Sequence, residues 1–382
     1  MASIGNPASI QIQCCESNSF EVLPATCSSP WTPFNPFNRE RSVGRSNIEW
    51  DWLNYHESFT GVPYFPKWYP PCLWIQDYTD IDGGKAWLNQ CDIVKEAGTQ
   101  AGSIKLQIIL AQNDKKITKI IFQNTFLHLQ LIMTSYYGRY FFQALVDSCD
   151  LSLLDLIIAR LTLSVEDLAN LSCHPYGAQC LKRLINALPI LDERSLSQAP
   201  FKFVTALSFR FYELMTNRTG SSIIQECLEV LSVPHNLPLY TELSHFCMDL
   251  ATHERGCVSL NRALDYVDCL LTTEPISIIC HNALQLAYHP YGHFVIQFIL
   301  GMQMNDCNEE ICQNLQGHYA ALSTRKEGSH VVEKCLQSNS RAFALAELIW
   351  NDRLGDIASD RYGNHVLQTA IKETQVRALS FS

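Results

Sequence analysis

The chain has 382 residues, more than one compact core requires, so it holds either two domains or one extended array. Hydrophobic residues make up 47% and charged residues 17%, a composition that supports a buried core and excludes a wholly disordered chain. The formal net charge of −10 excludes broad electrostatic attraction to nucleic acid or anionic membranes, so any such binding would depend on a local site.

Residues 1–84 are rich in Ser, Asn, Pro and aromatic residues, in segments such as WTPFNPFN and PYFPKWYPPCLW. Proline at this spacing prevents a long helix. We predict an irregular, partly disordered leader whose aromatic clusters are candidates for docking on the rest of the chain or on a partner. Because we find neither a secretory signal nor a membrane-spanning segment, we expect a cytoplasmic protein with a nuclear pool.

From about residue 85 a short frame recurs eight times, each copy opening with a glycine that is followed by a helical apolar pattern. Successive glycines are 36, 39, 43, 36, 36, 36 and 35 residues apart. The glycines are Gly102, Gly138, Gly177, Gly220, Gly256, Gly292, Gly328 and Gly363.

Apolar side chains follow each glycine at +3, +4, +7 and +8, which places them on one stripe of an α-helix. Only Lys105 and Ser259 interrupt this stripe at the +3 and +4 positions. From the second copy onward, a Leu or Ile stands six residues before the glycine, where we predict the end of a preceding helix. We expect each glycine to form a tight interhelical turn, where φ can be positive.

A helical unit of this size cannot bury its apolar face alone and must stack on its neighbours. The periodicity therefore predicts an all-α solenoid over residues 85–382. Periodicity alone leaves HEAT, armadillo, TPR and other helical arrays open as alternatives.

The residues at +1, +2 and +5 fall within one narrow arc of the helix, away from the apolar stripe, and we predict that they form a solvent-facing ridge. Five copies carry Gln at +5 and a sixth carries Glu, which favours hydrogen-bond recognition over a surface kept only for solubility. The triplets are Ser103/Ile104/Gln107, Arg139/Tyr140/Gln143, Ala178/Gln179/Lys182, Ser221/Ser222/Gln225, Cys257/Val258/Asn261, His293/Phe294/Gln297, Ser329/His330/Glu333 and Asn364/His365/Gln368.

The strings HPYGHFVIQFIL, RKEGSHVVEKCL and DRYGNHVLQTAI resemble Pumilio (PUF) repeats, and the resemblance extends over about residues 86–375. It implies a right-handed, crescent-shaped superhelix of eight repeats, a Pumilio homology domain over residues 85–382. It also implies that each repeat reads one base of single-stranded RNA from the concave face. The RNA would run antiparallel to the repeats, so that the eighth repeat meets the 5′ end.

On this resemblance the +1 and +5 side chains of every triplet are the candidate base-reading residues. Asn364 with Gln368 suits uracil, because amides match its carbonyl acceptors and its N–H donor. Ser329 with Glu333 suits guanine, which presents two adjacent N–H donors to a carboxylate. The pairs of the first and fourth copies follow the family's adenine pattern. Candidate stacking residues at +2 are Tyr140, Phe294, His330 and His365.

Several triplets depart from the family pattern. Arg139 and Lys182 carry only donors, so we expect them to hold phosphate or an acceptor edge rather than to pair in the usual way. Asn261 is one methylene shorter than Gln, and His293 leaves the sixth position unspecified. The chain also ends 19 residues after Gly363, where the family adds a capping half-repeat, so we expect the last repeat to fray or to be covered by the leader or a partner.

No catalytic or metal-binding pattern is present. The 16 cysteines form no CxxC pair and the histidines no HExxH motif, so we predict neither metal nor cofactor. Cys257 has no His/Asp partner in the repeat frame, and carboxylates are not paired. His174 and His289, each in an HPYG string, are interpreted as turn or inter-repeat hydrogen-bonding residues. We predict that the protein is not an enzyme.

Two functions remain open. The resemblance implies a monomeric, sequence-selective RNA-binding protein that recognises 5′-UG sites in mRNA 3′ untranslated regions. Such a protein regulates translation and mRNA stability, with decay or translation-repression proteins as further partners. The alternative is a divergent helical scaffold that binds protein and has little RNA affinity.

Overall fold

The part of the chain that the structure describes is built of helices. The structure is a computed structural model and describes residues 86–189, 198–266 and 273–380. These residues all belong to one compact unit. The regular elements in the described ranges are α-helices and one 3₁₀ turn, Phe126–His128. The predicted leader over residues 1–84 lies outside them.

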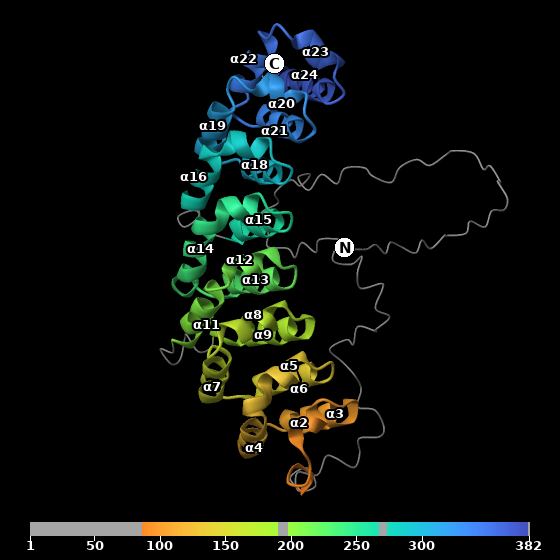
Figure 1. Ribbon diagram of the computed structural model, residues 1–382, viewed down its shortest axis with the longest axis vertical. Helices are drawn as coiled ribbons and strands as arrows, with labels where there is room; N and C mark the ends of the chain where they lie inside the picture. The colour runs from red at the N-terminus through yellow and green to blue at the C-terminus, as the bar shows by residue number, and fades with distance from the viewer. Residues whose placement is uncertain (1–85, 190–197, 267–272, 381–382) are drawn as a thin grey trace, which may run out of the picture. The chain divides into compact units, whose positions relative to one another are not determined.

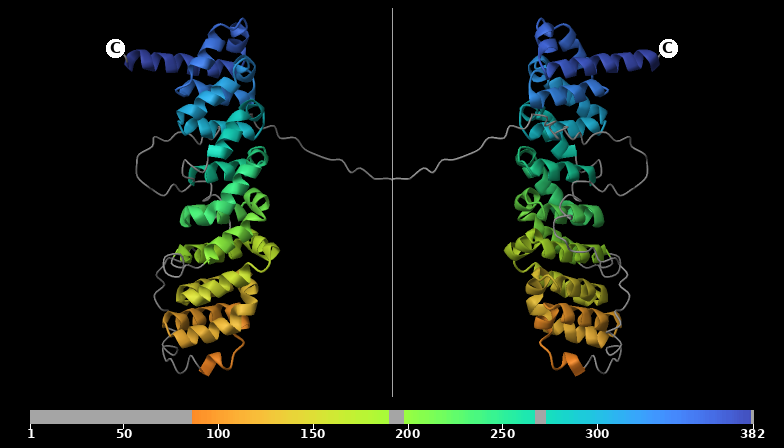
Figure 2. Two further views of the ribbon diagram at one scale, coloured as in Figure 1. Left: turned by 90° about the vertical axis from the view of Figure 1, so that its left-hand side faces the viewer. Right: turned by 90° about the vertical axis from the view of Figure 1, so that its right-hand side faces the viewer.

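Eight helices carry the eight repeated glycines and form one row, the glycine row. Each packs directly on the next, from α3 on α6 through to α21 on α24. Figure 1 shows this succession along the long axis, and Figure 2 shows it from two sides. The members are α3 (Gln100–Ala111), α6 (Gly138–Ser148), α9 (Pro175–Ala187), α13 (Gly220–Val230), α15 (Gly256–Tyr266), α18 (Gly292–Gly301), α21 (Lys326–Gln337) and α24 (Gly363–Ser380).

A short leading helix precedes most members of the glycine row and packs on the member that follows it. These leading helices are α2 (Ile93–Ala97), α5 (Leu129–Thr134), α8 (Val165–Cys173), α12 (Phe211–Thr216), α17 (Ala283–Ala287), α20 (Tyr319–Ser323) and α23 (Leu354–Ser359).

A third set of helices forms an outer row, in which α7, α11, α14, α16, α19 and α22 contact one another in that order. The outer helices are α4 (Lys115–Thr125), α7 (Leu151–Leu161), α11 (Ala199–Ser208), α14 (Val233–Ala251), α16 (Thr273–His281), α19 (Asn305–Asn314) and α22 (Ala342–Ile349). Helix α14 is exceptional because it continues through Pro238 and packs on α15, so it serves as the outer helix of repeat 4 and the leading helix of repeat 5.

The predicted apolar stripe is the core of the array. In α18 the +3, +4, +7 and +8 residues Val295, Ile296, Ile299 and Leu300 are all buried, and the same positions of α21 are completely buried. Together with the three rows of helices, this confirms the predicted all-α, helical-repeat solenoid.

Each helix of the glycine row needs an acceptor for its first free N–H groups, and the residue three before the glycine supplies it in seven of the eight repeats. His289 Nδ1, for example, accepts from the backbone N–H groups of Tyr291 and Gly292, both at 3.2 Å. His174 makes the equivalent bonds in α9, so the interpretation of both HPYG histidines as turn residues is confirmed. In the remaining repeat, Arg325 lies over the ring of Tyr288 instead.

The expected reason for the repeated glycines was wrong. Among the described residues the one glycine with positive φ is Gly317, which does not belong to the repeat frame. The repeated glycines are required by close approach instead. A Cβ on Gly328 would stand 2.7 Å from the carbonyl oxygen of Leu322, six residues earlier, and one on Gly256 would stand 2.7 Å from that of Leu250. Glycine therefore sets how closely the leading helix approaches the glycine row.

None of the helices in the described ranges combines the length and the apolar composition needed to cross a bilayer.

Candidate nucleic-acid interface

The +1 side chains do not lie on an open ridge, which corrects the prediction that all three positions of each triplet face solvent. In seven repeats the +1 residue is buried, and only Asn364 in the last repeat is exposed. The buried +1 residues are Ser103, Arg139, Ala178, Ser221, Cys257, His293 and Ser329.

The neighbouring repeat explains this burial. The +1 position borders the apolar stripe, on the side where the next helix of the glycine row packs. Ser103 is one example: its Oγ donates to the backbone carbonyl of Tyr137 at the start of the next repeat, at 2.9 Å. Asn364 is open because no further described helix of this row follows α24.

The +2 and +5 side chains form the accessible part of the interface. Phe294 and His365 are exposed, while Tyr140 and His330 are partly buried. The +5 residues are partly or fully open in every repeat except the sixth, where Gln297 is buried. We use the term reading face for these +2 and +5 positions along the glycine row.

Repeat 7 places a carboxylate on the reading face. The Glu333 side chain is 25% exposed, and its Oε1 lies 3.8 Å from Nδ1 of His330. Burial raises the pKa of Glu333, and the neighbouring His330 and His365 oppose that rise. The hydroxyl of Ser329 donates to the backbone carbonyl of Lys326, so it does not hydrogen-bond to the Glu333 carboxylate.

Repeat 8 has the most open triplet, since Asn364, His365 and Gln368 are all exposed. Gln368 Nε2 donates to Asn364 Oδ1 at 3.4 Å, so the +1 and +5 amides of this repeat converge. The +1 and +5 residues of repeat 1 converge in the same way, with Gln107 Nε2 donating to Ser103 Oγ at 3.1 Å.

Arg139 in repeat 2 is enclosed by tyrosines. Its guanidinium carbon lies 4.5 Å from the ring centres of Tyr140 and Tyr176 and 4.8 Å from that of Tyr136. It also donates to Gln179 Oε1 at 3.0 Å and to the hydroxyl of Tyr140 at 2.5 Å. Arg139 thus joins repeats 2 and 3, and a role toward phosphate or a base edge would require these contacts to be exchanged.

Gln143, the predicted +5 reading residue of the same repeat, is partly buried on the reading face and is separated in function from its +1 partner. Within the described part of the chain, Arg139 hydrogen-bonds to Gln179 and Tyr140 and not to Gln143. The +1 and +5 side chains of repeat 2 therefore do not converge as those of repeats 1 and 8 do. Arg139 was expected not to pair in the usual way, and in the structure the tyrosines hold its guanidinium beside repeat 3. Gln143 alone stays a candidate for contact with a base.

Two further predicted reading residues contact the next repeat. Lys182 Nζ forms an ion pair with Glu226 at 3.2 Å, and Asn261 Nδ2 donates to the carbonyl of Phe294 at 3.5 Å. In repeats 3 and 5, therefore, the +5 side chains already have protein partners.

Within the described residues, no group of three His, Cys, Asp or Glu side chains could hold a metal ion. Burial raises the pKa of the Cys257 thiol to about 11, so this cysteine is protonated at neutral pH and unsuited to act as a nucleophile.

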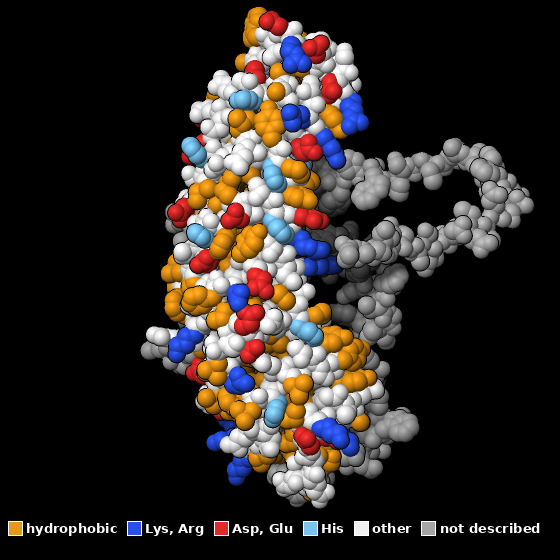
Figure 3. All heavy atoms as spheres, viewed as in Figure 1, with side chains coloured by type: hydrophobic (Ala, Val, Ile, Leu, Met, Phe, Trp, Pro, Cys, Tyr) orange, Lys and Arg blue, Asp and Glu red, His pale blue; other side chains and the backbone are white. Residues whose placement is uncertain are grey.

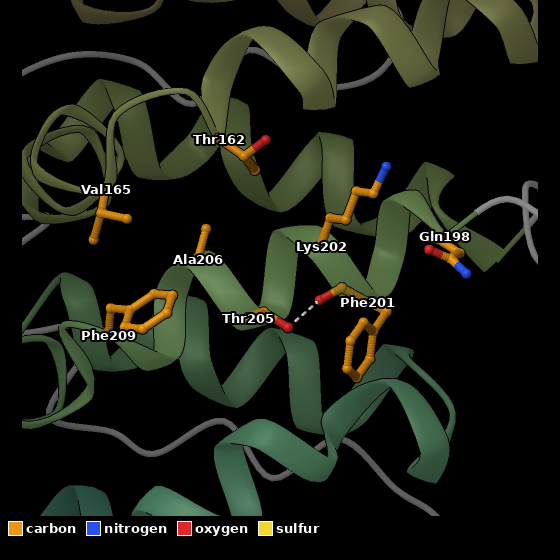
Figure 4. A pocket seen from close by; sticks show the side chains of 8 residues that line it. All are labelled: Thr162, Val165, Gln198, Phe201, Lys202, Thr205, Ala206 and Phe209. Carbon is orange, nitrogen blue, oxygen red and sulfur yellow. Dashed lines mark hydrogen bonds between the residues drawn. The ribbon is translucent and has the colours of Figure 1, made fainter.

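A shallow pocket of about 360 Å³ lies away from the predicted site residues (Figure 4). It is lined by α11 and by the turn between α7 and α8, and it includes Phe201, Lys202 and Phe209 but none of the predicted reading or stacking residues. In Figure 3, basic and acidic side chains are interspersed over the visible face. Such a distribution is not that of a broad phosphate-binding surface.

Sequence reasoning missed two sets of residues that build this interface. The first comprises the caps other than the two histidines already noted: Thr99, Ser135, Asn217, His253 and Asp360. The recurrence of an acceptor three residues before the glycine was the available signal. The second is the tyrosine enclosure of Arg139, whose members Tyr136 and Tyr176 come from different repeats and carry no local signal.

Comparison with known proteins agrees with this architecture. A family model described as "Pumilio-family RNA binding repeat" matches residues 210–244, 246–269, 282–301, 318–342 and 353–375, which correspond to repeats 4–8. Pumilio homolog 8 of Arabidopsis thaliana is 31% identical over 73% of this chain and 53% of its own length. Pumilio homolog 12 of the same plant is 29% identical over 73% of this chain and 46% of its own length. The chain thus spans about half the length of these curated relatives.

Solved structures share the fold. The Puf4 RNA-binding domain bound to the HO endonuclease RNA 3′ UTR recognition sequence has a TM-score of 0.65 and 24% identity, and the match covers 74% of this chain and 87% of that one. The RNA-binding domain of yeast Puf5p bound to AAT2 RNA has a TM-score of 0.62 and 21% identity, over 75% and 85% of the two chains. Five of the eight repeats thus match the Pumilio-family RNA binding repeat, and relatives named Pumilio homologs match 73% of the chain, so the chain carries Pumilio (PUF) repeats.

Proposed function

We propose that this protein binds single-stranded RNA sequence-selectively through the reading face, at sites that begin 5′-UG in mRNA 3′ untranslated regions. As a monomer in the cytoplasm, with a nuclear pool, it regulates translation and mRNA stability by bringing decay or translation-repression proteins to the bound message. The match to Pumilio-family RNA binding repeats supports RNA as the ligand, and the solved Puf domain bound to a 3′ UTR sequence supports the kind of RNA.

The observation that carries the UG preference is the partly exposed carboxylate of Glu333 beside the exposed amides of repeat 8. A carboxylate accepts hydrogen bonds only, and guanine alone among the four bases presents two adjacent N–H donors, N1–H and N2–H, on its Watson–Crick edge. Asn364 and Gln368 supply both donors and acceptors, as uracil requires. His330 and His365 provide flat faces on which the two bases stack, each worth about 1–3 kcal/mol.

Repeats other than 7 and 8 contribute weaker base preferences. Ser103 with Gln107 and Ser221 with Gln225 favour adenine opposite repeats 1 and 4. The acidic net charge implies few phosphate contacts, so we expect a shallow dependence of affinity on salt. Affinity would then come mainly from stacking and base edges.

The test compares oligonucleotides that contain 5′-UGUA and 5′-UCUA by fluorescence anisotropy at fixed salt. We expect the wild-type protein to prefer the guanine oligonucleotide by about tenfold or more, because a hydrogen bond to a charged group contributes about 1.5–3 kcal/mol. Glu333→Gln should abolish this preference. The matched control Glu309→Gln removes the same charge from the outer row, where Glu309 accepts a hydrogen bond from Gln313 on its own helix, and should leave the preference intact.

Equal binding of both oligonucleotides by the wild-type protein would refute base recognition by repeat 7. The protein-binding scaffold would then be the better account. A loss of preference in both glutamine variants would also count against the proposal, because it would attribute the effect to net charge rather than to the position of Glu333.

A further inference from the structure

Repeat 6 differs from the other repeats in that both of its base-reading positions are enclosed. Residue exposure is 5% for His293 at +1 and 7% for Gln297 at +5. At every other +5 position along the glycine row the side chain is at least partly open. At this repeat, protein side chains fill the space that a base edge would otherwise use.

The two side chains fill it by bonding to each other. Gln297 Nε2 lies 2.8 Å from His293 Nδ1. Because an amide nitrogen only donates, Nδ1 is the acceptor, and the proton of the neutral ring is on Nε2. These two atoms thus satisfy each other, and both residues lie on α18.

The imidazole ring is also packed on two sides. Its centre lies 4.0 Å from that of Phe294, at an interplanar angle of 35°. On the side of repeat 7 it stacks on His330, with ring centres 6.4 Å apart and planes 23° apart. This imidazole is larger than the serine side chain that stands at +1 in repeats 1, 4 and 7.

The ring carries no charge that would draw RNA into the site. Burial lowers the pKa of His293 to about 4, and the nearby His330 lowers it further than Glu327 can offset. At neutral pH the pair is therefore uncharged, enclosed and already hydrogen-bonded.

We propose that repeat 6 is silent: it supports the RNA strand without selecting the base that faces it. The inference rests on the proposed RNA-binding function and refines it. Phe294, which is 40% exposed, offers an aromatic face on which any of the four bases can lie. His293 Nδ1 and Gln297 Nε2 are engaged with each other and both residues are buried, so a base edge cannot use that pair without displacing it.

The test uses four oligonucleotides that differ only at the third nucleotide, 5′-UGN, which faces repeat 6 when repeat 8 holds the 5′ end. The wild-type protein should bind all four within twofold while still discriminating at the second nucleotide. Changing the remaining positions one at a time locates the silent position without assuming this register.

His293→Ser recreates in repeat 6 the Ser/Gln pair that this chain already has in repeats 1 and 4. We expect this variant to gain a preference of at least fivefold among the four bases at the same nucleotide. Circular dichroism melting establishes that the variant is folded. Gln297→Ala is the second variant, and like the wild-type protein it should bind all four oligonucleotides with similar affinity.

The results distinguish failure of RNA binding from failure of the silent-repeat proposal. Wild-type discrimination above fivefold at the third nucleotide, abolished by Gln297→Ala, would overturn the silent repeat while leaving RNA binding in place. If a folded His293→Ser protein still binds the four oligonucleotides equally, the enclosed His293–Gln297 pair is not the cause of the missing base preference. Failure of the wild-type protein to bind any oligonucleotide better than a scrambled one would refute RNA binding itself, and the silent repeat with it.

Discussion

Replacing Gly328 with alanine tests whether close approach, rather than backbone freedom, explains the repeated glycines. The added Cβ would stand 2.7 Å from the carbonyl oxygen, 2.8 Å from Cδ2 and 3.0 Å from Cα of Leu322. Two of these atoms are backbone, so α20 and α21 must separate. Overpacking of this kind costs about 1–3 kcal/mol, and the better helix propensity of alanine returns about 1 kcal/mol. We expect a net loss of up to roughly 2 kcal/mol.

The control is Gly355→Ala, in α23, where no atom lies within 4 Å of the added Cβ. With no contact to relieve, this variant should gain about 0.5–1 kcal/mol. Urea denaturation followed by circular dichroism compares the two midpoints with the wild-type value. The opposite signs are the diagnostic result. If Gly328→Ala were as stable as Gly355→Ala, the contact with Leu322 would not be the reason for glycine.

Three other predictions concern the capping, the buried ring and the enclosed guanidinium. His289→Ala should lower the free energy of unfolding by about 1 kcal/mol through loss of the cap, and His289→Asn should restore most of it in the same denaturation assay. The pKa of His293 is lowered to about 4, against about 6.5 in the unfolded chain, so the unfolded state takes up the proton first. Stability should therefore fall between pH 6.5 and 4, and urea titrations of His293→Gln should show a smaller fall. Arg139→Lys cannot bond Gln179 and Tyr140 together, so it should lower the thermal midpoint, with an expected cost of about 1–2 kcal/mol.

The spacing of glycines and apolar residues was enough to predict the architecture. Stripes such as Val331, Val332, Cys335 and Leu336 have the 3.6-residue period of a helix buried on one side, and they are buried in the structure. The leading helices from the second repeat onward were also predicted, because Leu or Ile stands six residues before each of those glycines. These features are local, so one repeat of sequence contains them.

The environment of the +1 residues could not be predicted in this way. On a helical wheel, +1 lies about 20° from the apolar +8 position, and a single helix does not show which flank a neighbour will cover. Burial of Ser329 and His293 depends on the spacing between α18 and α21, which is a property of the stacked pair. The ion pair of Lys182 with Glu226 has the same origin, since its two residues belong to different repeats.

The continuity of α14 has a mechanical consequence. Elsewhere in the array a turn separates an outer helix from the next leading helix, as Asn282 does between α16 and α17. Between repeats 4 and 5 a single helix of 19 residues replaces that turn. This junction therefore lacks the interhelical turn at which other boundaries can bend, and Pro238, which has no backbone N–H to donate, interrupts the hydrogen-bond ladder within the helix instead.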